Sequence, residues 1–367
     1  MNATSADERF MARALELARL GTGLASPNPL VGAVVVSAGQ IVGEGTHAFA
    51  GRKHAEVLAL EQAGAAARAG TLYLNLEPCC HHGRTGPCSE AVIGAGIARV
   101  VAAMSDPNPE VSGWGFDRLR AAGIEVVCGL CETEARRLNE AFAKWIVTRS
   151  PLVTLKAAMT LDGKIAPGAG TGDAPVWITG ELARAHVQEL RHASDAILVG
   201  VGTVLADNPL LTDRSGRPRR RPLLRVVLDS KLRLPLDGRL AESARDDVVV
   251  FCTAPDSARR QALMRCGVRV EQVAAGTDGR TDIPAVLRRL GELEILSLLI
   301  EGGSRVNGKV LSGGQVDKVF LYFAPTILGS DAVPFVQTLD EGTELPRLHD
   351  IELHEFGDDF GVEGYLK

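Results

Sequence analysis

The sequence is poor in aromatic residues and contains no long hydrophobic run. Phe, Trp and Tyr together make up 4% of the 367 residues. No apolar stretch approaches the roughly 20 residues that a membrane-spanning helix requires. The first eight residues are polar and acidic, and they lack the apolar core of a secretory signal. We therefore expect a cytoplasmic protein with no membrane partner.

An excess of positive charge is also missing. The formal net charge is −5, from 40 Lys and Arg against 45 Asp and Glu. Proteins that bind nucleic acid neutralise its phosphates with clustered Lys and Arg. The densest cluster, residues 217–221, contains no aromatic residue on which a base could stack, so we interpret it as a solvated loop. We expect no nucleic-acid partner.

The cysteines do not suggest a disulfide framework. Their number, seven, is odd, and their spacing is irregular. Together with a metal-type cluster, this pattern is typical of a reducing compartment. Cys128-Gly129-Leu130-Cys131 has the spacing of a redox pair or of half a zinc ribbon, but no second pair follows it. We interpret Cys128 and Cys131 as structural cysteines.

The length and the order of the elements predict two α/β domains. A chain of 367 residues, 46% hydrophobic and 23% charged, is ordinary for a globular protein of two domains. Strands alternate with helices in the first half, which is typical of a layered α/β domain. Arg149-Ser150-Pro151 ends a helical pattern. We place the boundary there, with domains over residues 1–150 and 151–367.

Apolar periodicity and turn residues predict the individual elements. Helices are expected over residues 7–20, 54–63, 116–122, 132–148, 181–193 and 304–311. Strands are expected over residues 31–36, 41–45, 71–76, 100–104, 125–128, 152–158, 196–199, 223–228 and 295–300.

Three potential zinc ligands and one carboxylate are grouped in the first half of the chain. His54 is followed two residues later by Glu56, and Pro78 precedes Cys79, with Cys88 further on. One imidazole and two thiolates are preferred zinc ligands, and three protein ligands leave a fourth tetrahedral position for water. His-x-Glu followed by Pro-Cys and a second Cys is the signature of zinc deaminases that act on bases. We predict a catalytic Zn²⁺ held by His54, Cys79 and Cys88, with Glu56 as the catalytic residue that moves protons.

Other interpretations of this cluster stay open at this point. A buried Cys is more often a small hydrophobic residue, and a lone His is more often a satisfied polar group. The second Cys follows an inserted loop, residues 81–87, where the common deaminase pattern has only two residues. Cys80 or His81 could supply a fourth ligand and close the site, as in a zinc-stabilised binding module. Pro78 is expected to open a helix, which would place Cys79 near a helix N-terminus and favour its thiolate.

Two glycine turns in the second half follow predicted strands. Gly200-Val201-Gly202-Thr203 begins like a dinucleotide fingerprint, but Leu205 stands where the third glycine is expected. Glu301-Gly302-Gly303-Ser304 lies between an apolar run and a predicted helix. Glycine at such a position lets a phosphate approach backbone N–H groups, although each turn alone could be a tight connection. Together the two turns favour a nucleotide site.

Two runs in the first half resemble the deaminase half of the bifunctional pyrimidine deaminase/reductase family of riboflavin biosynthesis. They are residues 26–34, Ser-Pro-Asn-Pro-Leu-Val-Gly-Ala-Val, and residues 77–88, Glu-Pro-Cys-Cys-His-His-Gly-Arg-Thr-Gly-Pro-Cys. The family usually has Ser at the position of Cys80 and Pro at the position of Gly86. These departures flank the ligands and remove none of them. The resemblance implies a cytidine-deaminase-like, three-layer α/β/α fold for this half.

Five short runs in the second half resemble the reductase half of the same family. They are Leu-Asp-Gly-Lys at 161–164, Trp-Ile-Thr at 177–179, Asp-Ala-Ile-Leu-Val-Gly at 195–200, Val-Leu-Ala-Asp-Asn-Pro at 204–209 and Glu-Gly-Gly at 301–303. That half is similar in fold to dihydrofolate reductase and uses NADPH. The two resemblances together cover nearly the whole chain, in the order of the bifunctional form.

The resemblance also implies roles for individual residues. In the deaminase half it implies substrate contacts at Asn28, His47, His81 and Arg84. In the reductase half it implies NADPH contacts at Met159, Trp177, Thr203, Asp207, Ser230, Gly303, Ser304, Arg305, Val306 and Asn307. In the same half it implies substrate contacts at Arg191, Leu211, Arg214 and Glu301.

Physical chemistry supports part of these lists. Arg binds phosphate bidentately, which suits Arg191 and Arg214 as clamps on a phosphoribosyl substrate. The alternatives are a solvated helix face for Arg191 and a loop charge for Arg214. Asn28 lies between two prolines and could be an ordinary turn residue.

The resemblance implies two consecutive reactions. The first is hydrolytic deamination of 2,5-diamino-6-(5-phosphoribosylamino)pyrimidin-4-one, with protons moved by Glu56. The second is NADPH-dependent reduction of the ribosyl group to ribityl. Lys156 and Asp207 are candidate polar groups near the second centre, although Lys156 could be an ordinary strand-end charge. We also expect a homo-oligomer, without predicting the number of subunits.

Two further hypotheses are less favoured by the sequence. A deaminase for a different base, fused to a folate-type reductase, is disfavoured by the inserted loop and by the lack of a basic surface. A protein with one retired active site is disfavoured because all four residues of the zinc cluster are present.

Overall fold

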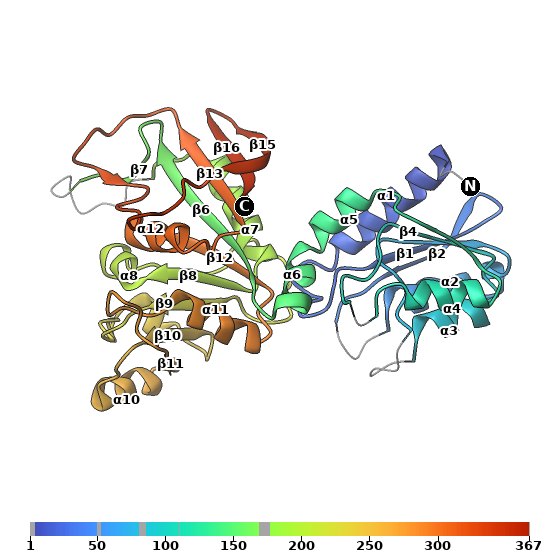
Figure 1. Cartoon of the computed structure of the whole chain (residues 1–367), viewed down its shortest axis with the longest axis horizontal. Helices are drawn as coiled ribbons and strands as arrows, with labels where there is room; N and C mark the ends of the chain where they lie inside the picture. Colours follow the sequence, from blue (N-terminus) through green and yellow to red (C-terminus); the bar gives the residue numbers. More distant parts are fainter. Residues whose placement is uncertain (1–3, 50–52, 81–85, 110, 169–176, 367) are drawn as a thin grey trace. The chain divides into compact units, whose positions relative to one another are not determined.

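The computed structural model describes residues 4–49, 53–80, 86–109, 111–168 and 177–366. The chain divides into two compact units. The first comprises Met1–Arg149 with Pro218–Arg220, and the second comprises Ser150–Arg217 with Arg221–Lys367. Each unit contains its own sheet and its own hydrophobic core (Figure 1).

The first unit is built on a sheet with the strand order β2-β1-β3-β4-β5. Strands β1 and β2 form a hairpin, β3 pairs with β1 antiparallel, and β3, β4 and β5 are parallel. The strands are β1 (Gly32–Ser37), β2 (Gln40–Thr46), β3 (Thr71–Leu74), β4 (Arg99–Ala102) and β5 (Glu125–Cys128). The helices are α1 (Ser5–Arg19), α2 (Ala55–Ala63), η1 (Gly64–Ala67), α3 (Cys88–Gly94), α4 (Trp114–Ala121), α5 (Glu132–Leu138) and α6 (Glu140–Thr148).

Helices cover both faces of this sheet and make three layers. In Figure 1, α1 and α5 lie on one face, and α2, α3 and α4 lie on the other. Helix α2 packs very closely on β2, and only glycine fits at position 45, because a Cβ there would lie 2.0 Å from the carbonyl oxygen of Ala55. The close approach brings the first turn of α2, which carries two of the predicted site residues, against the sheet. The predicted three-layer α/β/α arrangement is therefore confirmed.

Two details of the predicted helices are wrong. The expected helix over residues 132–148 is interrupted between α5 and α6 at Asn139. Asn139 is buried, and its side chain accepts a hydrogen bond from the backbone N–H of Leu30 and donates one to the carbonyl oxygen of Leu30. This tertiary contact outweighs the local helical pattern. The expected helix does not begin at Pro78, since residues 78–80 are irregular, and among the described residues the next helix begins at Cys88.

The second unit is built on a longer sheet with the order β11-β10-β9-β8-β12-β6-β13-β16-β15. The strands β11, β10, β9, β8, β12, β6 and β13 run parallel to their neighbours. Strands β16 and β15 add an antiparallel edge next to β13. The strands are β6 (Leu152–Thr160), β8 (Ala196–Gly200), β9 (Leu224–Leu228), β10 (Val248–Cys252), β11 (Val268–Gln272), β12 (Ser297–Gly302), β13 (Lys318–Ala324), β15 (Leu348–Phe356) and β16 (Asp359–Leu366). A separate pair is formed by β7 (Lys164–Ala166) and β14 (Val333–Pro334).

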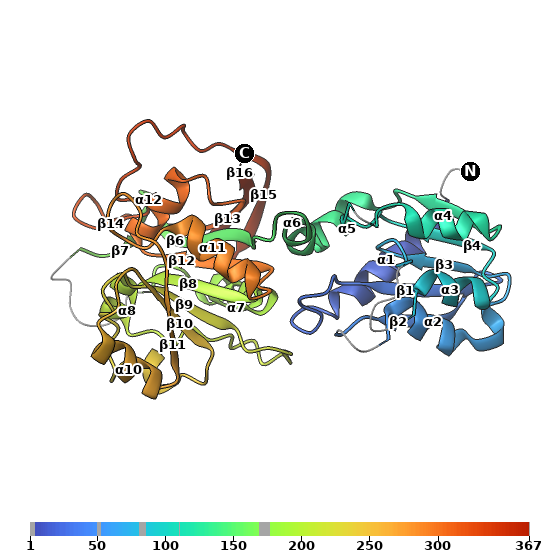
Figure 2. The ribbon, with the colours of Figure 1, turned by 60° about the horizontal axis from the view of Figure 1, so that its bottom comes forward.

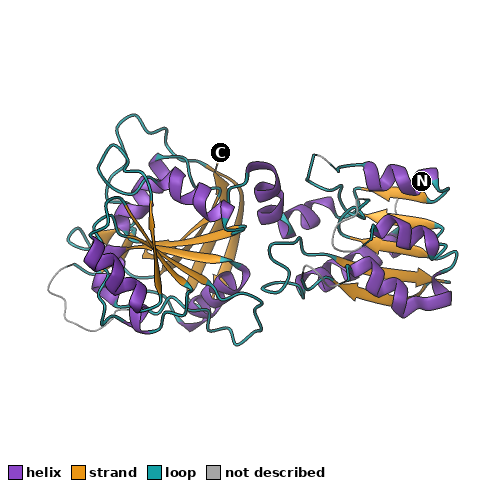
Figure 3. Ribbon diagram, turned by 90° about the horizontal axis from the view of Figure 1, so that it is seen from below, coloured by secondary structure: helices purple, strands orange, loops and turns teal. Residues whose placement is uncertain are grey.

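Helices again cover both faces (Figures 2 and 3). They are α7 (Glu181–Ala193), α8 (Val201–Asp207), α9 (Arg239–Glu242), α10 (Ser257–Arg265), α11 (Ile283–Glu292) and α12 (Ser304–Ser312). One core joins α11 and α12 to the sheet, and a second core on the opposite face joins α8, α9 and α10 to it. Helix α7 packs on β13 through Ala183, Val187, Phe320 and Tyr322. In the described part of the chain, no helix combines the length and the apolar character needed to cross a membrane.

Candidate functional site

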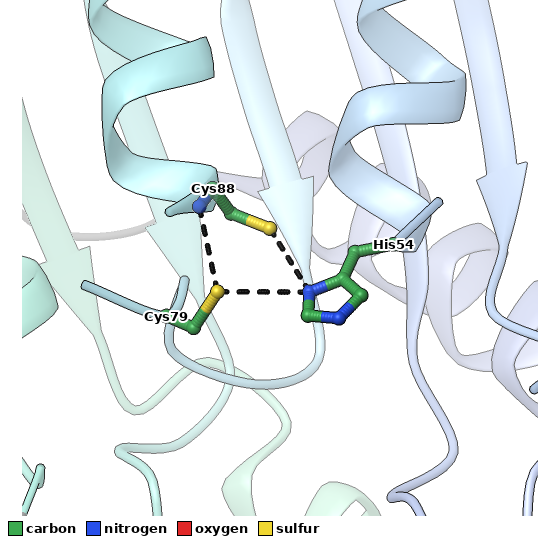
Figure 4. Close-up of side chains that lie close together, drawn as sticks. All are labelled: His54, Cys79 and Cys88. Carbon is green, nitrogen blue, oxygen red and sulfur yellow. Dashed lines mark hydrogen bonds between the residues drawn. The ribbon is translucent and has the colours of Figure 1, made fainter. Parts of the chain in front are cut away.

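The three predicted zinc ligands point toward one another in the first unit (Figure 4). The Nδ1 atom of His54 lies 3.1 Å from Sγ of Cys88 and 3.6 Å from Sγ of Cys79. Among the described residues of this unit, the only group of His, Cys, Asp and Glu ligand atoms that lie within 4.8 Å of one another consists of these three residues. Cys80 is not part of the group, and His81 lies outside the described residues.

The local fold explains how the three side chains meet. His54 is the N-cap residue of α2, and Cys88 is the first residue of α3. Cys79 lies in the irregular segment after β3, so it is Cys88 and not Cys79 that begins a helix. The backbone N–H of Cys88 donates a hydrogen bond to Sγ of Cys79, at 3.4 Å. This hydrogen bond holds the start of α3 next to the Cys79 thiol.

The electrostatics of the group suit a divalent cation. Hydrogen bonding from Cys88, helped by His54 and opposed by burial, lowers the pKa of the Cys79 thiol. The hydrogen bond with Cys79 raises the pKa of the His54 ring. Both shifts reflect negative charge that is concentrated on sulfur. Zinc bonds of about 2.0–2.3 Å in a tetrahedron place N and S ligands about 3.5 Å apart, so the observed distances fit zinc.

Glu56 lies beside these ligands in the first turn of α2. The residue is only 4% exposed. Burial, followed by the charge of Cys79, raises the pKa of its carboxyl group. A raised pKa brings a carboxyl group nearer to neutral pH, which is the direction that general acid–base catalysis requires.

Asn28 and His47 form a hydrogen-bonded pair next to the ligands. Nδ2 of Asn28 lies 2.9 Å from Nε2 of His47, and the rings of His47 and His54 are 5.1 Å apart, edge to face. His47 is buried, and burial is the main cause that lowers its pKa. A neutral His47 can accept the hydrogen bond from the Asn28 amide. Asn28 is thus held by a specific partner, which a simple turn residue would not need. The predicted contact Arg84 lies outside the described residues, as does His81.

A surface cavity of about 410 Å³ opens beside the ligands. His54 lines it together with Lys53, Val57, Gly86, Pro87, Glu90 and Ala91. His54 is the member of the ligand group that lines this cavity.

Three predicted residues of the second unit form one charged cluster. Arg191 donates from Nε and Nη2 to the two carboxylate oxygens of Glu301, at 2.6 and 2.9 Å. Nζ of Lys156 lies 3.8 Å from Oε2 of Glu301. All three side chains are nearly buried, at 11–13% exposure. Arg191 is therefore not on a solvated helix face, and Lys156 is not an ordinary strand-end charge.

The two cations determine the ionisation of this cluster. Burial alone would raise the pKa of Glu301, but the charges of Lys156 and Arg191 outweigh it and hold the pKa at about 2. Burial lowers the pKa of Lys156, and Glu301 opposes that effect. The cluster carries one more cation than anion, which favours an anionic or electron-rich ligand.

Arg214 and Trp177 line a second surface cavity, of about 390 Å³. Trp177 is 67% exposed, and the guanidinium of Arg184 lies 5.2 Å from its ring centroid. The backbone N–H of Arg214 donates to Oε1 of Gln188. Leu211, by contrast, is buried and has a positive φ of 54°. An exposed aromatic ring with two nearby Arg side chains is a surface that can bind a nucleotide or a phosphate.

The predicted NADPH residues of the second glycine turn form a cradle at the start of α12. Gly302 and Gly303 have φ values of 63° and 105°, which favour glycine. A Cβ on Gly303 would lie 2.9 Å from Oγ1 of Thr203, which itself donates to the carbonyl oxygen of Gly302. Among the described residues, Ser304 Oγ and Asn307 Oδ1 are buried without a hydrogen-bond partner. The Ser304 hydroxyl can donate a hydrogen bond, so it and the backbone N–H groups at the start of α12 fit a dinucleotide phosphate.

The other predicted NADPH residues are more dispersed. Met159 is buried on β6, and Asp207 ends α8 at the surface. Oγ of Ser230 accepts a hydrogen bond from the backbone N–H of Thr281. Arg305 is exposed and bonds Gln337 through Nε, while Val306 is partly buried.

One buried pair close to Arg214 was not predicted from the sequence. Nδ1 of His192 lies 2.9 Å from Oδ2 of Asp213, and both side chains are almost fully buried. The pair fixes the backbone next to Arg214. Nothing in the spacing of these two residues distinguishes them from surface charges.

The chain matches two sequence families. Residues 4–104 match the cytidine and deoxycytidylate deaminase zinc-binding region, and residues 151–362 match the RibD C-terminal domain. The riboflavin biosynthesis protein RibD of Actinobacillus pleuropneumoniae is 44% identical over 357 residues, which cover 95% of this chain and 93% of the relative. RibD of Bacillus amyloliquefaciens is 42% identical over 365 residues, which cover 98% and 96%.

Solved structures of similar proteins cover the same length. Acinetobacter baumannii RibD superposes with a TM-score of 0.87 at 36% identity, over 99% of both chains. A diaminohydroxyphosphoribosylaminopyrimidine deaminase/5-amino-6-(5-phosphoribosylamino)uracil reductase from Thermotoga maritima superposes with a TM-score of 0.85 at 39% identity, also over 99% of both. The predicted fold class, the zinc-binding deaminase region and the pair of activities are confirmed, and the chain belongs to the RibD family of bifunctional deaminase/reductases of riboflavin biosynthesis.

Proposed function

We propose that residues 1–150 deaminate 2,5-diamino-6-(5-phosphoribosylamino)pyrimidin-4-one and that residues 151–367 then reduce its ribosyl group to ribityl. The observation that carries the first step is the convergence of His54 Nδ1, Cys79 Sγ and Cys88 Sγ beside the buried Glu56. The names of the similar proteins from Thermotoga maritima and Actinobacillus pleuropneumoniae support the substrate and the pathway.

His54, Cys79 and Cys88 would hold the zinc ion, which when bound supplies an activated water at neutral pH. Glu56 would take a proton from the attacking water and deliver protons to the ring nitrogen and to the leaving amino group, so that water and the amino group become a carbonyl oxygen and ammonia. Asn28, fixed by His47, hydrogen-bonds the pyrimidine. His81 and Arg84 are proposed as further contacts on the basis of the family resemblance alone.

The cradle of Gly303 to Asn307 and Thr203 would hold the pyrophosphate of NADPH at the start of α12. Its backbone N–H groups and the hydroxyl of Ser304, whose Oγ has no partner, can donate hydrogen bonds to phosphate oxygens. Met159, Trp177, Asp207, Ser230, Arg305 and Val306 complete the proposed cofactor contacts. When bound, NADPH supplies the hydride that reduces C1′.

Glu301 and Arg191 would bind the ribosyl portion of the second substrate next to this cradle, because Glu301 is directly followed by Gly302 and Gly303. Arg214, which lines the same cavity as Trp177, would bind the phosphate. Leu211 supplies an apolar contact. Lys156, buried 3.8 Å from Glu301, is proposed to hold a proton near the carbonyl or imine that is reduced.

A two-step assay on the purified full chain tests this function. With the diaminopyrimidine substrate alone, we expect ammonia release and accumulation of the deaminated ribosyl compound. Addition of NADPH should then produce the ribityl compound with one NADPH oxidised per molecule. Ammonia release from cytidine but not from this substrate would contradict the substrate assignment, and equal rates with NADH would contradict the cofactor assignment.

Two expectations stay predictions: that the chain binds no nucleic acid and that it forms a homo-oligomer. Sedimentation velocity of the purified chain, with and without added RNA, measures both.

A further inference from the structure

Lys156 has an incomplete ion pair. It lies on β6 and faces α7, on the same side of the sheet as Glu301 of β12 and Arg191 of α7. Arg191 already engages both carboxylate oxygens of Glu301, which leaves Lys156 with the longer contact of 3.8 Å. A nearly buried ammonium group is costly unless other groups compensate its lost hydration. Another neighbour must therefore contribute to its stabilisation.

The face of an aromatic ring supplies that neighbour. In the register of β6 and β13, Lys156 lies opposite Phe320 and Ala158 lies opposite Tyr322, so all four side chains share one face of the sheet. Nζ of Lys156 lies 5.8 Å from the centroid of the Tyr322 ring. Tyr322 is fully buried. A cation over the face of a desolvated ring is attracted by its quadrupole.

The Tyr322 ring is fixed in turn by His186 of α7. The hydroxyl oxygen of Tyr322 lies 2.6 Å from Nδ1 of His186. Burial lowers the pKa of His186 and raises the pKa of Tyr322. The phenol therefore stays protonated and donates a hydrogen bond to the neutral imidazole. The His186 ring packs against Phe320 and Phe356, with centroids 4.8 and 5.0 Å away. Helix α7 thus holds both neighbours of Lys156: Arg191 binds Glu301, and His186 binds Tyr322.

The charged and titratable groups around this arrangement come from several elements. Lys156 faces Glu301 of β12, Arg191 of α7 and Tyr322 of β13. His186 faces Glu189 of its own helix, His354 of β15 and Glu363 of β16.

We propose that Tyr322, held by His186, is a positioning residue that keeps the Lys156 ammonium in place for the reduction. This inference rests on the proposed role of Lys156 in the reductase half. Nothing in the sequence pointed to either residue, because His186 and Tyr322 lie 136 positions apart and look like ordinary helix and strand residues.

The test measures reductase kcat and KM against pH for the full chain and its variants. Tyr322→Phe and His186→Leu each remove the hydrogen bond but keep most of the packing, and both should lower kcat about five-fold at pH 8. They should also move the alkaline limb of kcat to lower pH, because Lys156 would lose its proton more readily. KM for the substrate should change less than two-fold. His186→Gln should restore most of the activity, because its amide oxygen can accept the Tyr322 hydroxyl.

The control variant is Tyr365→Leu, which removes a second contact between a Lys and an aromatic ring, at the start of β13, where Nζ of Lys318 lies 5.2 Å from the ring centroid of Tyr365 on β16. Its pH profile should equal that of the unmodified chain. Unchanged kcat and an unchanged alkaline limb in both Tyr322→Phe and His186→Leu would overturn the positioning role. Full reductase activity in Lys156→Ala would instead overturn the proposed role of Lys156 itself. Deaminase activity and melting temperature, measured on each preparation, report whether the variant is folded.

Discussion

Glu56 and Glu301 show how burial gives two carboxyl groups opposite properties. Both side chains are largely removed from solvent. Glu56 has no Lys or Arg among the groups that shift it, so burial raises its pKa. Glu301 lies between Lys156 and Arg191, which outweigh burial and hold its pKa at about 2. Glu56 is suited to exchange protons, and Glu301 is suited to remain an anion.

Replacing Glu56 by Gln should separate metal binding from catalysis. The amide keeps the size of the side chain and leaves His54, Cys79 and Cys88 intact, but it cannot accept a proton. We expect full zinc content by elemental analysis and a loss of deaminase kcat of at least about 100-fold. Reductase activity on the deaminated substrate should be unchanged. Deaminase turnover near that of the unmodified chain would reject the role of Glu56.

The depressed pKa of Glu301 predicts a pH dependence of stability. Its folded pKa of about 2 lies below the ordinary value of 4.5, so the ionised form stabilises the folded state above pH 4.5. This stabilisation, on the order of 3 kcal/mol, is lost as the pH falls from about 4.5 to about 2. The melting temperature of Glu301→Gln should therefore lie well below that of the unmodified chain at pH 6. The difference should shrink toward pH 3, and a difference independent of pH would contradict the assignment.

At the scale of the elements, local patterns predicted every strand of the first sheet, but in the second sheet they predicted only β6, β8, β9 and β12. They also missed several helices, namely α3, α8, α9, α10 and α11. Residues 181–193 form α7 as expected, and the strands expected over residues 31–36 and 41–45 pair as β1 and β2. The zinc cluster was predictable because its ligand types and their order are written in the sequence. The position of the ligands relative to the helices was not predictable, since Cys88 rather than Cys79 begins a helix. The break at Asn139 depends on a contact with Leu30, which lies 109 positions away and leaves no local signal.

The hydrophobic periodicity of the sequence likewise does not predict contacts between distant elements. The Lys156–Glu301–Arg191 cluster joins β6, β12 and α7. Its members were proposed from family likeness, and only the alignment of β6 and β12 in the sheet explains their meeting. The partner strands β7 and β14, of three and two residues, are too short for any periodic pattern to reveal.

The cradle at the start of α12 predicts a selective effect on the cofactor. Gly303→Ala would place a Cβ 2.9 Å from Oγ1 of Thr203 and would strain a backbone with φ of 105°. We expect KM for NADPH to rise at least about ten-fold, while deaminase kcat is unchanged. Gly314→Ala is the matched control, because Gly314 also has a positive φ, 61°, but its Cβ would meet no atom within 4 Å. Equal effects of the two variants would indicate strain rather than a cofactor site.

At the scale of the whole molecule, two compact units each carry one candidate centre. The zinc ligands and Glu56 all belong to the first unit, and the cluster of Lys156, Glu301 and the glycine cradle belongs to the second. The two activities should therefore respond independently to treatments that affect one centre.

Removal of zinc tests this independence. Dialysis against a chelator should abolish ammonia release and leave NADPH oxidation with the deaminated substrate unchanged, because the second centre contains no proposed metal ligand. Added zinc should restore the first activity. Parallel loss of both activities would indicate that the metal stabilises the whole chain.

The coordination of zinc in the full chain is the most direct test of the central claim, which is that three protein ligands leave one position for water. X-ray absorption at the zinc edge should give two sulfur atoms at about 2.3 Å and two lighter atoms at about 2.0 Å. The sulfur count should stay the same in Cys80→Ser, because Cys80 does not belong to the ligand group. A third sulfur that disappears in Cys80→Ser, or a purified active deaminase without zinc, would contradict the account.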